Sequence, residues 1–357
     1  MNAELAAQQA NATQLNVIAT IHPNDFIYRF LCELPGFSKT DAIKHYYHDA
    51  SNSALSLKKI LKEVCGYKAR AKLSILEFAS GFGCVTRHFK NVLPNCSTTS
   101  CDIHPEAINF LRDELGVDAA LSANLPEDLD LGRTYDVIFV LSFFSHMPKS
   151  TFSRWLRKLG TLLNPGGHLI FTTHGMESQR ICIPYCIFDG EGFFFRSQSD
   201  QKDLNTTEYG TTCTKPQYVL ARIFEIPELS LRCFQEGYWW RHQDLWVVQH
   251  REQIPTSPDL GSLDVVNSSE ISGWVWNSRK PNQTFEVEIY DGDRLLVRLE
   301  SNAFRHDLLS AKIGSGQYAF RFPMPSELND GEPHQLRAIV VGTDFELKNS
   351  PKTYQSQ

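Results

Sequence analysis

Two carboxylates and a glycine-containing loop are spaced so that they could bind a nucleoside. Glu77 ends an apolar segment and is followed by Gly81 and Gly83 in a loop of small residues, and Asp102 ends the next apolar segment. Glycine lets the backbone come close to a ligand, and a helix that opens after the loop would offer free N–H groups to a carboxylate. Because a carboxylate at Asp102 can accept hydrogen bonds from both ribose hydroxyls, the pattern predicts a pocket for an adenosine-bearing ligand.

The same residues also have a purely structural interpretation. The two glycines could simply turn the chain, and Asp102 could cap the next helix. The ligand-binding interpretation is favoured because the two acidic strand ends and the loop between them occur in register. Glu77 would face the positive end of the ligand, and Thr86 stands where a dinucleotide fingerprint has a third small residue. Both features favour S-adenosylmethionine over NAD.

Apolar segments that alternate with helical segments must position these residues. Strands are expected over residues 73–79, 97–102, 119–122, 135–142 and 168–173, and helices over 85–93, 105–115 and 150–163. Two final strands could follow at 229–233 and 245–248. Such alternation is typical of a parallel sheet that is covered on both faces.

The length of 357 residues suits two domains, and the composition changes along the chain. We expect an α/β fold with a Rossmann-like doubly wound sheet over 71–252, preceded by a helical N-terminal extension or lid over 1–70 whose first residues are flexible. A linker is expected over 253–260. Short alternating strands and turns then predict an all-β, β-sandwich-like module over 261–357.

Five stretches within residues 73–175 carry a resemblance to a known family. They are Leu76-Glu77-Phe78-Ala79-Ser80-Gly81-Phe82-Gly83, Ser100-Cys101-Asp102-Ile103, Tyr135-Asp136-Val137-Ile138-Phe139, Phe144-Ser145-His146-Met147-Pro148 and Asn164-Pro165-Gly166-Gly167-His168-Leu169-Ile170-Phe171. In order and spacing they resemble class I S-adenosylmethionine-dependent methyltransferases, particularly bacterial enzymes that act on small molecules and sugars. Ala79 departs from the glycine that the family most often has, and alanine fits there if its φ is negative.

The resemblance implies S-adenosylmethionine as the cofactor and gives individual residues a role. Glu77, Phe78 and the backbone of Ala79, Ser80, Gly81 and Gly83 would hold the methionine part, Asp102 the ribose, and Ile103, Ser122 and Ala123 the adenine, with Leu141 and Ser142 beneath the departing methyl group. The nucleotide-methylating type has an Asn/Asp-Pro-Pro-aromatic pattern, which Leu141-Ser142-Phe143-Phe144 lacks. This difference argues against adenine or a glutamine amide as the methyl acceptor.

A hydroxyl acceptor benefits from a general base, and two histidines follow strands at the ligand-binding edge of the sheet. His146 follows the fourth strand and is the first catalytic candidate, and His174 ends the fifth strand and is the second. Either could instead be a structural hydrogen-bonding residue. The segment His242-Gln243-Asp244 could also reach the pocket, although a turn with a capping aspartate is favoured.

Aromatic residues near the end of the first domain have two interpretations. Core packing or an interface is expected, with sugar stacking as the alternative, for Tyr238, Trp239, Trp240 and Trp246. Residues 45–47, His-Tyr-Tyr, belong either to a lid over the cofactor or to a helix that packs on the domain.

Residues 261–350 resemble an all-β module found beside bacterial glycosyltransferases and related glycan-modifying enzymes. The stretches that carry this resemblance are Ser272-Gly273-Trp274-Val275-Trp276, Phe304-Arg305-His306-Asp307-Leu308 and Gly316-Gln317-Tyr318-Ala319-Phe320-Arg321-Phe322. Trp274 and Trp276 lie two apart on a strand, and we expect them to fill the core of the module rather than to bind sugar.

Charge and composition narrow the function classes. The net charge is −6 and no lysine/arginine cluster forms a stripe, so a nucleic acid is not expected as a partner. No apolar segment is long enough for a membrane span and the N-terminus lacks a signal core, which predicts a cytoplasmic protein. The 9 cysteines are expected to be reduced thiols, and no metal site is expected.

Together these features favour an enzyme that methylates an oxygen of a sugar or glycan precursor in a bacterial cytoplasm. One alternative is a non-catalytic S-adenosylmethionine-binding protein whose β module docks to carbohydrate or protein. A weaker alternative is an NAD-dependent oxidoreductase or epimerase, because the loop lacks a third small residue.

Overall fold

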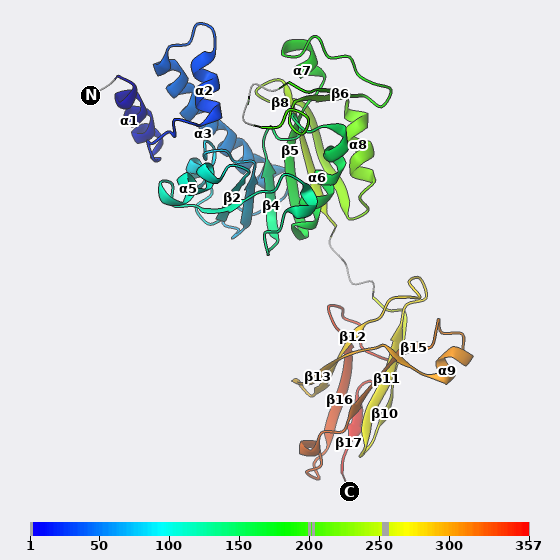
Figure 1. Ribbon diagram of the computed structural model, residues 1–357. Helices are drawn as coiled ribbons and strands as arrows, with labels where there is room; N and C mark the ends of the chain where they lie inside the picture. Colours follow the sequence, from blue (N-terminus) through cyan, green and yellow to red (C-terminus); the bar gives the residue numbers. More distant parts are fainter. Residues whose placement is uncertain (1–2, 199–200, 202–203, 252–256, 357) are drawn as a thin grey trace. The chain divides into compact units, whose positions relative to one another are not determined.

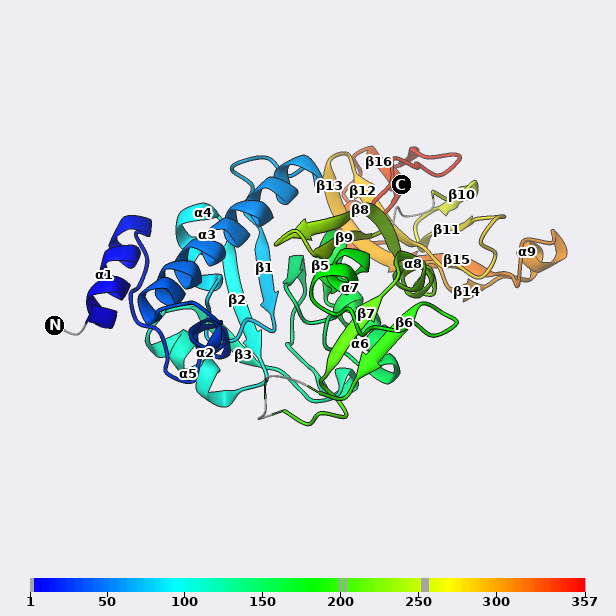
Figure 2. The same ribbon diagram turned by 90° about the horizontal axis from the view of Figure 1, so that it is seen from above.

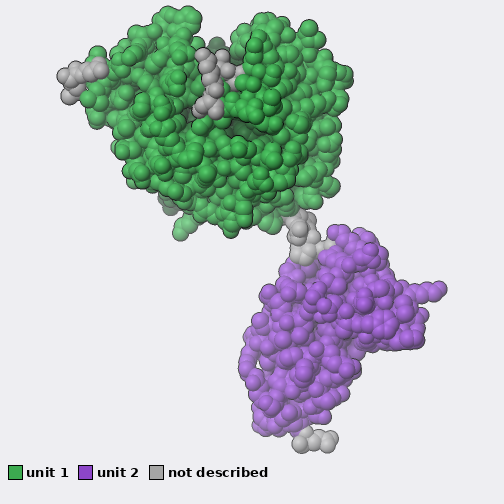
Figure 3. Space-filling model, in the orientation of Figure 1, with its two compact units in different colours: residues 1–252 green, residues 253–357 purple. Residues whose placement is uncertain are grey.

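The computed structural model describes residues 3–198, 201, 204–251 and 257–356. The chain forms two compact units, Met1–Glu252 and Gln253–Gln357 (Figure 3). Residues 253–256 of the expected linker lie outside the described residues, and the first strand of the second unit begins at Leu260. Each unit has a hydrophobic core of its own.

A seven-stranded mixed sheet forms the centre of the first unit, which has a Rossmann-like fold (Figure 1). From one edge to the other its strands are β3 (Asp118–Leu121), β2 (Ser97–Asp102), β1 (Ser74–Phe78), β4 (Tyr135–Val140), β5 (Leu163–His174), β9 (Gln243–His250) and β8 (Leu229–Trp239). The strands β1 to β5 are parallel, as the alternating pattern predicted. The two final strands join this sheet as expected, and β9 is antiparallel to both of its neighbours because a hairpin joins it directly to β8 with no crossover helix between them.

Helices cover both faces of this sheet (Figure 2). On one face lies α3 (Lys39–Glu63), and its buried Leu57 and Leu61 pack with Ile75 of β1 and Val137 of β4. This helix begins with a capping box in which Ser38 and Asp41 bond each other's backbone N–H groups. The N-terminal extension is therefore part of the core of this unit.

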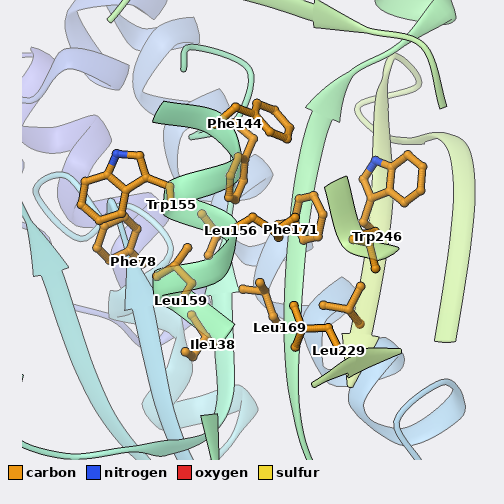
Figure 4. Close-up of a cluster of buried hydrophobic side chains, with 14 of the residues drawn as sticks. Phe78, Ile138, Phe144, Trp155, Leu156, Leu159, Leu169, Phe171, Leu229 and Trp246 are labelled. Atoms are coloured by element: carbon orange, nitrogen blue, oxygen red, sulfur yellow. The ribbon is translucent and has the colours of Figure 1, made fainter. Parts of the chain in front are cut away.

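The opposite face of the sheet packs against α6 (Lys149–Thr161) and α8 (Pro216–Phe224). Figure 4 shows three side chains of α6, Trp155, Leu156 and Leu159, directed at the strands beneath them. Neighbouring residues of a strand point to opposite faces, so Ile138 belongs to this core and Val137 to the other. The two cores hold the strand ends in fixed positions.

The remaining helical segments of the first unit are short. They are α1 (Ala3–Leu15), α2 (Phe26–Glu33), α4 (Phe89–Val92), α5 (Pro105–Asp113) and α7 (Met176–Ile181), with 3₁₀ turns at Thr86–His88 and Pro126–Asp128. The expectation that the first residues are flexible is wrong, because the alanine-rich segment forms α1 and buries Ala12 beside Tyr46 and Tyr47. Both tyrosines are buried, so the packing interpretation of residues 45–47 holds for them.

A two-stranded insertion lies next to the loop that follows β4. Its strands are β6 (Phe193–Arg196) and β7 (Thr211–Thr214). The N–H groups of Gly210 and Thr212 donate to the carbonyl oxygens of His146 and Ser145, at 2.9 Å and 2.8 Å. These two bonds fix the insertion against the end of the sheet where His146 stands.

The second unit consists of two four-stranded antiparallel sheets. One contains β10 (Leu260–Val266), β11 (Glu270–Trp276), β15 (Gln317–Pro323) and β14 (Ala303–Phe304), and the other β13 (Arg294–Glu300), β12 (Glu286–Asp291), β16 (His334–Val340) and β17 (Lys352–Tyr354). Short helical segments lie at His306–Ser310 (α9) and Ser326–Leu328 (3₁₀). Residues of both sheets contribute to one hydrophobic core.

The two tryptophans of β11 lie outside that core. Ile271 and Val275 are buried in it, whereas Trp274 and Trp276 pack with Leu308 in a separate cluster. The expectation that these tryptophans fill the core is therefore wrong. Side chains alternate between the two faces of a strand, and in β11 Ile271 and Val275 point into the core. Trp274 and Trp276 therefore point to the other face, although their side chains are larger.

Among the described residues, no helix is both long and apolar enough to cross a membrane.

Candidate cofactor and acceptor site

The carboxyl ends of β1, β2, β4 and β5 meet at one edge of the sheet (Figure 1). Because β1 lies between β2 and β4, the strand order reverses there, and open α/β sheets bind ligands at such a point. Glu77, Asp102, Ser142 and His174 all stand at or next to these strand ends. Figure 3 shows the surface of the first unit hollowed at this edge.

Glu77 is a buried carboxyl group, with 4% of its surface exposed. Burial raises its pKa to about 8, the hydroxyl of Thr86 opposes this by donating a hydrogen bond to Oε2, and the nearby charge of Asp102 raises the pKa further. Burial disfavours the charged form of a carboxyl group, and an adjacent cation would restore it. An ammonium or sulfonium group is therefore a fitting neighbour for Glu77.

The loop after β1 adopts a backbone that most residues avoid. Ala79, Gly81 and Gly83 have φ of 58°, 56° and 74°. The condition stated above for Ala79, a negative φ, is not met, so alanine is held in a left-handed conformation at a cost in energy. A Cβ at Gly83 would stand 2.6 Å and 2.7 Å from the side chains of Leu115 and Leu111, whereas a Cβ at Gly81 would meet nothing within 4 Å. The open space at Gly81 lets a ligand approach the backbone.

Arg87 connects this loop to the N-terminal segment. The guanidinium is buried and donates from Nε to the carbonyl of Gly83 at 3.2 Å. From Nη1 it donates to the carbonyls of Ile18 and Thr20, at 3.0 Å and 2.9 Å, and from Nη2 to the hydroxyl of Tyr46 at 3.0 Å. One side chain thus binds three segments that are distant in the sequence.

Asp102 points at the same loop. Its Oδ2 accepts a hydrogen bond from the N–H of Gly81 at 2.7 Å, and its Oδ1 accepts one from the N–H of His104 at 3.1 Å. Oδ1 also lies 2.8 Å from Nδ1 of His104, so Oδ2 is the oxygen that keeps a further acceptor site. Asp102 is close enough for its charge to raise the pKa of Glu77, so the two carboxyl groups are neighbours at the strand ends.

The side chains of the other predicted cofactor residues differ in their surroundings. Ser122 lies beside Asp102, since its N–H donates to the Asp102 carbonyl at 2.8 Å. Ile103 is half-buried, Ala123 packs against the core of the α6 face, and Leu141 against that of the α3 face. Phe78 points away from the site into the core beside Trp155, with ring centroids 5.3 Å apart (Figure 4).

Ser142, just after β4, belongs to a closed hydrogen-bond network. Ser142, at φ 60°, donates from its N–H to Oγ1 of Thr172 at 2.9 Å, and this hydroxyl donates to Oε1 of Gln243 at 2.7 Å. The amide of Gln243 donates to Oγ of Ser142 at 2.9 Å and contacts Nε2 of His174 at 3.3 Å. Because Nδ1 of His174 donates to the carbonyl of Thr212 at 3.1 Å, its Nε2 is an acceptor.

His174 is held neutral in this network. Burial lowers its pKa to about 3, and the neighbouring His146 and His242 act in the same direction. The contacts of both ring nitrogens and the low pKa together fit a residue that positions Gln243 and Ser142.

His146 stands beside His174 with its tautomer defined. Its Nδ1 lies 2.8 Å from the carbonyl of Gly210, to which only a protonated nitrogen can donate. In the neutral ring, Nε2 therefore carries the lone pair. The ring stacks on Tyr209, with centroids 4.5 Å apart, and its centroid lies 6.1 Å from that of His174.

Three residues of the site were missed or undervalued by sequence reasoning. Thr86 was considered only because it stands where a dinucleotide fingerprint has a small residue. Its hydroxyl was not recognised as a hydrogen-bond donor to Glu77. Gln243 was placed in a turn, but it pairs with His174 across β5 and β9. Tyr209 lies in a segment without a clear pattern. Across the residues that the structure describes, no group of three or more His, Cys, Asp or Glu could hold a metal ion.

The burial of Glu77 has a measurable consequence for stability. Between its ordinary value of 4.5 and its raised pKa of about 8, the folded protein keeps a proton that the unfolded chain has lost, so stability falls as pH rises through this range. We expect Glu77→Gln to melt at least ~2 °C above the wild type at pH 8, with the difference shrinking towards pH 4.5. Scanning calorimetry measures this, with exposed Glu228→Gln as the control. A lower melting temperature for Glu77→Gln at pH 8 would contradict the assignment.

Comparisons with known proteins agree with this geometry. Residues 76–169 match the family model of a methyltransferase domain. The tRNA N(3)-methylcytidine methyltransferase trm141 of Schizosaccharomyces pombe is 28% identical over 120 residues, which is 30% of this chain and 46% of that protein. The chain therefore matches less than half the length of that curated relative.

Two solved structures are similar to the chain at low sequence identity. CalS10 with bound S-adenosylmethionine, an amino pentose methyltransferase from Micromonospora echinaspora, is 16% identical, with a TM-score of 0.42 and 61% of this chain and 99% of that chain covered. The N-methyltransferase NodS from Bradyrhizobium japonicum, in complex with S-adenosylhomocysteine, is 16% identical, with a TM-score of 0.39 and 69% and 99% covered.

The site fits the cofactor of this family. Glu77 offers a buried acidic group to a cation, the space above Gly81 is open to a ligand, and Asp102 stands beside it with acceptor capacity. Residues 76–169 of the first unit match a methyltransferase domain, and S-adenosylmethionine is the cofactor that fits the site.

Proposed function

We propose that the chain is an O-methyltransferase that acts on a sugar or glycan precursor. The observation that carries the proposal is the position of His146, whose Nε2 is an acceptor, at the sheet edge where Glu77 and Asp102 also lie. A base at this edge stands on the acceptor side of a cofactor bound at β1 and β2. Methyl transfer to a hydroxyl needs such a base and an aligned acceptor.

The geometry and the family pattern support a role for each cofactor residue. Glu77 would pair with the ammonium of S-adenosylmethionine, the backbone of residues 79–83 with its carboxylate, and Asp102 with the ribose. Ile103, Ser122 and Ala123 would border the adenine, and Leu141 and Ser142 the methyl group. Bound S-adenosylmethionine supplies an electrophilic methyl group on a sulfonium.

His146 is the base in this proposal, and His174 is a positioning residue. The Nδ1–H of His146 is directed at a fixed carbonyl, so its Nε2 can take a proton from an acceptor hydroxyl. His174 has its Nε2 in contact with Gln243 and a pKa lowered to about 3, which leaves little basicity for proton transfer. The earlier assignment of His174 as a second catalytic candidate is therefore replaced by a role in orienting Gln243 and Ser142.

The acceptor class rests on the chemistry of the residues around His146. The side chains there are polar and uncharged: Ser142 and Gln243 bond each other, His174 is neutral, and the ring of Tyr209 stacks on His146. These groups suit an uncharged, hydroxyl-rich acceptor. The net charge of −6 supports a small-molecule or glycan acceptor over a nucleic acid, although the matching relative trm141 is named for methylation of tRNA.

The proposal also covers the second unit, as a docking module, and the cell compartment, as the bacterial cytoplasm. The resemblance of residues 261–350 to modules beside glycan-modifying enzymes supports a bacterial origin and a role in docking to carbohydrate or protein. All nine cysteines are free thiols, which supports a reducing, cytoplasmic environment.

Titration calorimetry tests the cofactor, and transfer of a tritiated methyl group tests the acceptor. We expect S-adenosylhomocysteine to bind and NAD not to bind, and label to appear on neutral glycans of a bacterial extract. Failure to bind S-adenosylhomocysteine contradicts the methyltransferase proposal. Binding without transfer to glycans, phenols or tRNA favours a non-catalytic binding protein, and label on tRNA alone overturns the acceptor class.

Removal of the ribose-binding carboxylate should weaken cofactor binding. For Asp102→Ala we expect the affinity for S-adenosylhomocysteine to fall by roughly 1–3 kcal/mol, because hydrogen bonds to a charged acceptor are lost. Calorimetric titration measures the dissociation constant, with exposed Asp128→Ala as a control of unchanged affinity. An unaltered constant in Asp102→Ala would remove the ribose assignment.

Replacement of the base should affect turnover and leave cofactor binding intact. For His146→Ala we expect kcat to fall by about 10²–10⁴-fold, the usual contribution of a general base. Initial rates with a tritiated methyl donor and titration with S-adenosylhomocysteine separate the two effects, and exposed His45→Ala serves as the control. Full activity in His146→Ala would show that the histidine is not the base.

A further inference from the structure

The hairpin between β8 and β9 carries an exposed tryptophan at a strained turn. Trp240 and Arg241 have φ of 50° and 61°, and the N–H of His242 donates to the carbonyl of Trp239 at 3.1 Å across them. Turns with two successive positive φ values strongly prefer asparagine and glycine. Tryptophan and arginine therefore cost stability here, and strain of this kind is found where a side chain has a functional role.

The exposed ring of Trp240 is continuous with the acceptor side of the site. Trp240 is 45% exposed, and its ring lies beside that of His242 with centroids 6.3 Å apart and an interplanar angle of 23°. The ring centroid of His242 lies 5.8 Å from that of His174, which is 6.1 Å from that of His146. Successive ring contacts thus lead from Trp240 to His146.

The imidazole beside Trp240 is a hydrogen-bond acceptor. The hydroxyl of Ser178 donates to the carbonyl of His242 at 2.6 Å, so its oxygen accepts from Nδ1–H of the same histidine at 3.1 Å. Nε2 of neutral His242 is therefore an acceptor. A flat indole face next to an imidazole acceptor matches the apolar face and the hydroxyl rim of a sugar ring.

We propose that Trp240 is the stacking platform for a neutral pyranose ring of the acceptor, and that it forms the outer end of the acceptor site. This inference rests on the proposed function and deepens it by naming a sugar-binding residue. Planar aromatic acceptors such as phenols would use the indole face as well, but they carry fewer hydroxyl donors than the rim of a pyranose ring.

Two substitutions at the same turn separate strain from recognition. Trp240→Gly and Arg241→Gly each place glycine at a positive φ, so both should raise the melting temperature by relieving the backbone. Only Trp240→Gly removes the indole ring. Arg241→Gly is therefore a matched control that changes the turn and keeps the platform.

Saturation-transfer NMR measures the binding of sugars directly. The probes are the methyl pyranosides of glucose, galactose, mannose and N-acetylglucosamine at millimolar concentration, with the full chain and saturating S-adenosylhomocysteine. We expect at least one pyranoside to bind the wild type and Arg241→Gly, and its affinity to fall at least tenfold in Trp240→Gly. Phenol and catechol are included as planar aromatic probes.

Three outcomes would overturn the proposal. They are equal pyranoside binding by Trp240→Gly and the wild type, no pyranoside binding by the wild type, and Trp240-dependent binding of the phenols alone. Titration of each variant with S-adenosylhomocysteine is the separate test of the methyltransferase function. A variant that binds this ligand normally and loses the sugar identifies an acceptor residue, whereas loss of both ligands contradicts a specific role for Trp240.

Discussion

The burial of a carboxyl group at the end of β1 is the constraint on which the site depends. Transfer of a charged group out of water is costly, and the protein meets part of this cost by keeping Glu77 protonated and bonded to Thr86. A bound cation compensates the same group in its ionised form. The burial of Glu77 is therefore less costly with a bound cation than without one. The rest of the domain must supply enough stability to offset this cost in the free protein.

That stability comes from the two cores of the sheet. Adjacent residues of β4, such as Val137 and Ile138, are buried on opposite faces, one under α3 and the other under α6. Strands enclosed in this way cannot shift register without exposing their apolar side chains. Glu77, Asp102 and Ser142 are consequently presented from rigid strand ends, while Tyr209 and Gln243 near His146 come from the insertion and from the start of β9.

The parallel strands and the acidic positions could be predicted because their signals are local. Each apolar segment of the sheet is short and bounded, and the glycine loop follows directly on Glu77. The conformation of Ala79 could not be predicted in this way, since alanine rarely adopts a positive φ and the loop imposes it from outside. The same holds for Trp274 and Trp276, where strand alternation placed smaller residues in the core. The hydrogen-bonding role of Gln243 could not be predicted, because its partner His174 is distant in the sequence.

The guanidinium of Arg87 has a consequence for the dynamics of the first unit. It is bonded both to Gly83 in the glycine loop and to the carbonyls of Ile18 and Thr20. If the N-terminal segment opened by itself, it would leave a buried positive charge with fewer acceptors, which is unfavourable. The amide protons of this segment should therefore exchange with solvent together with those of the loop, as one cooperative element, and not as a fraying terminus.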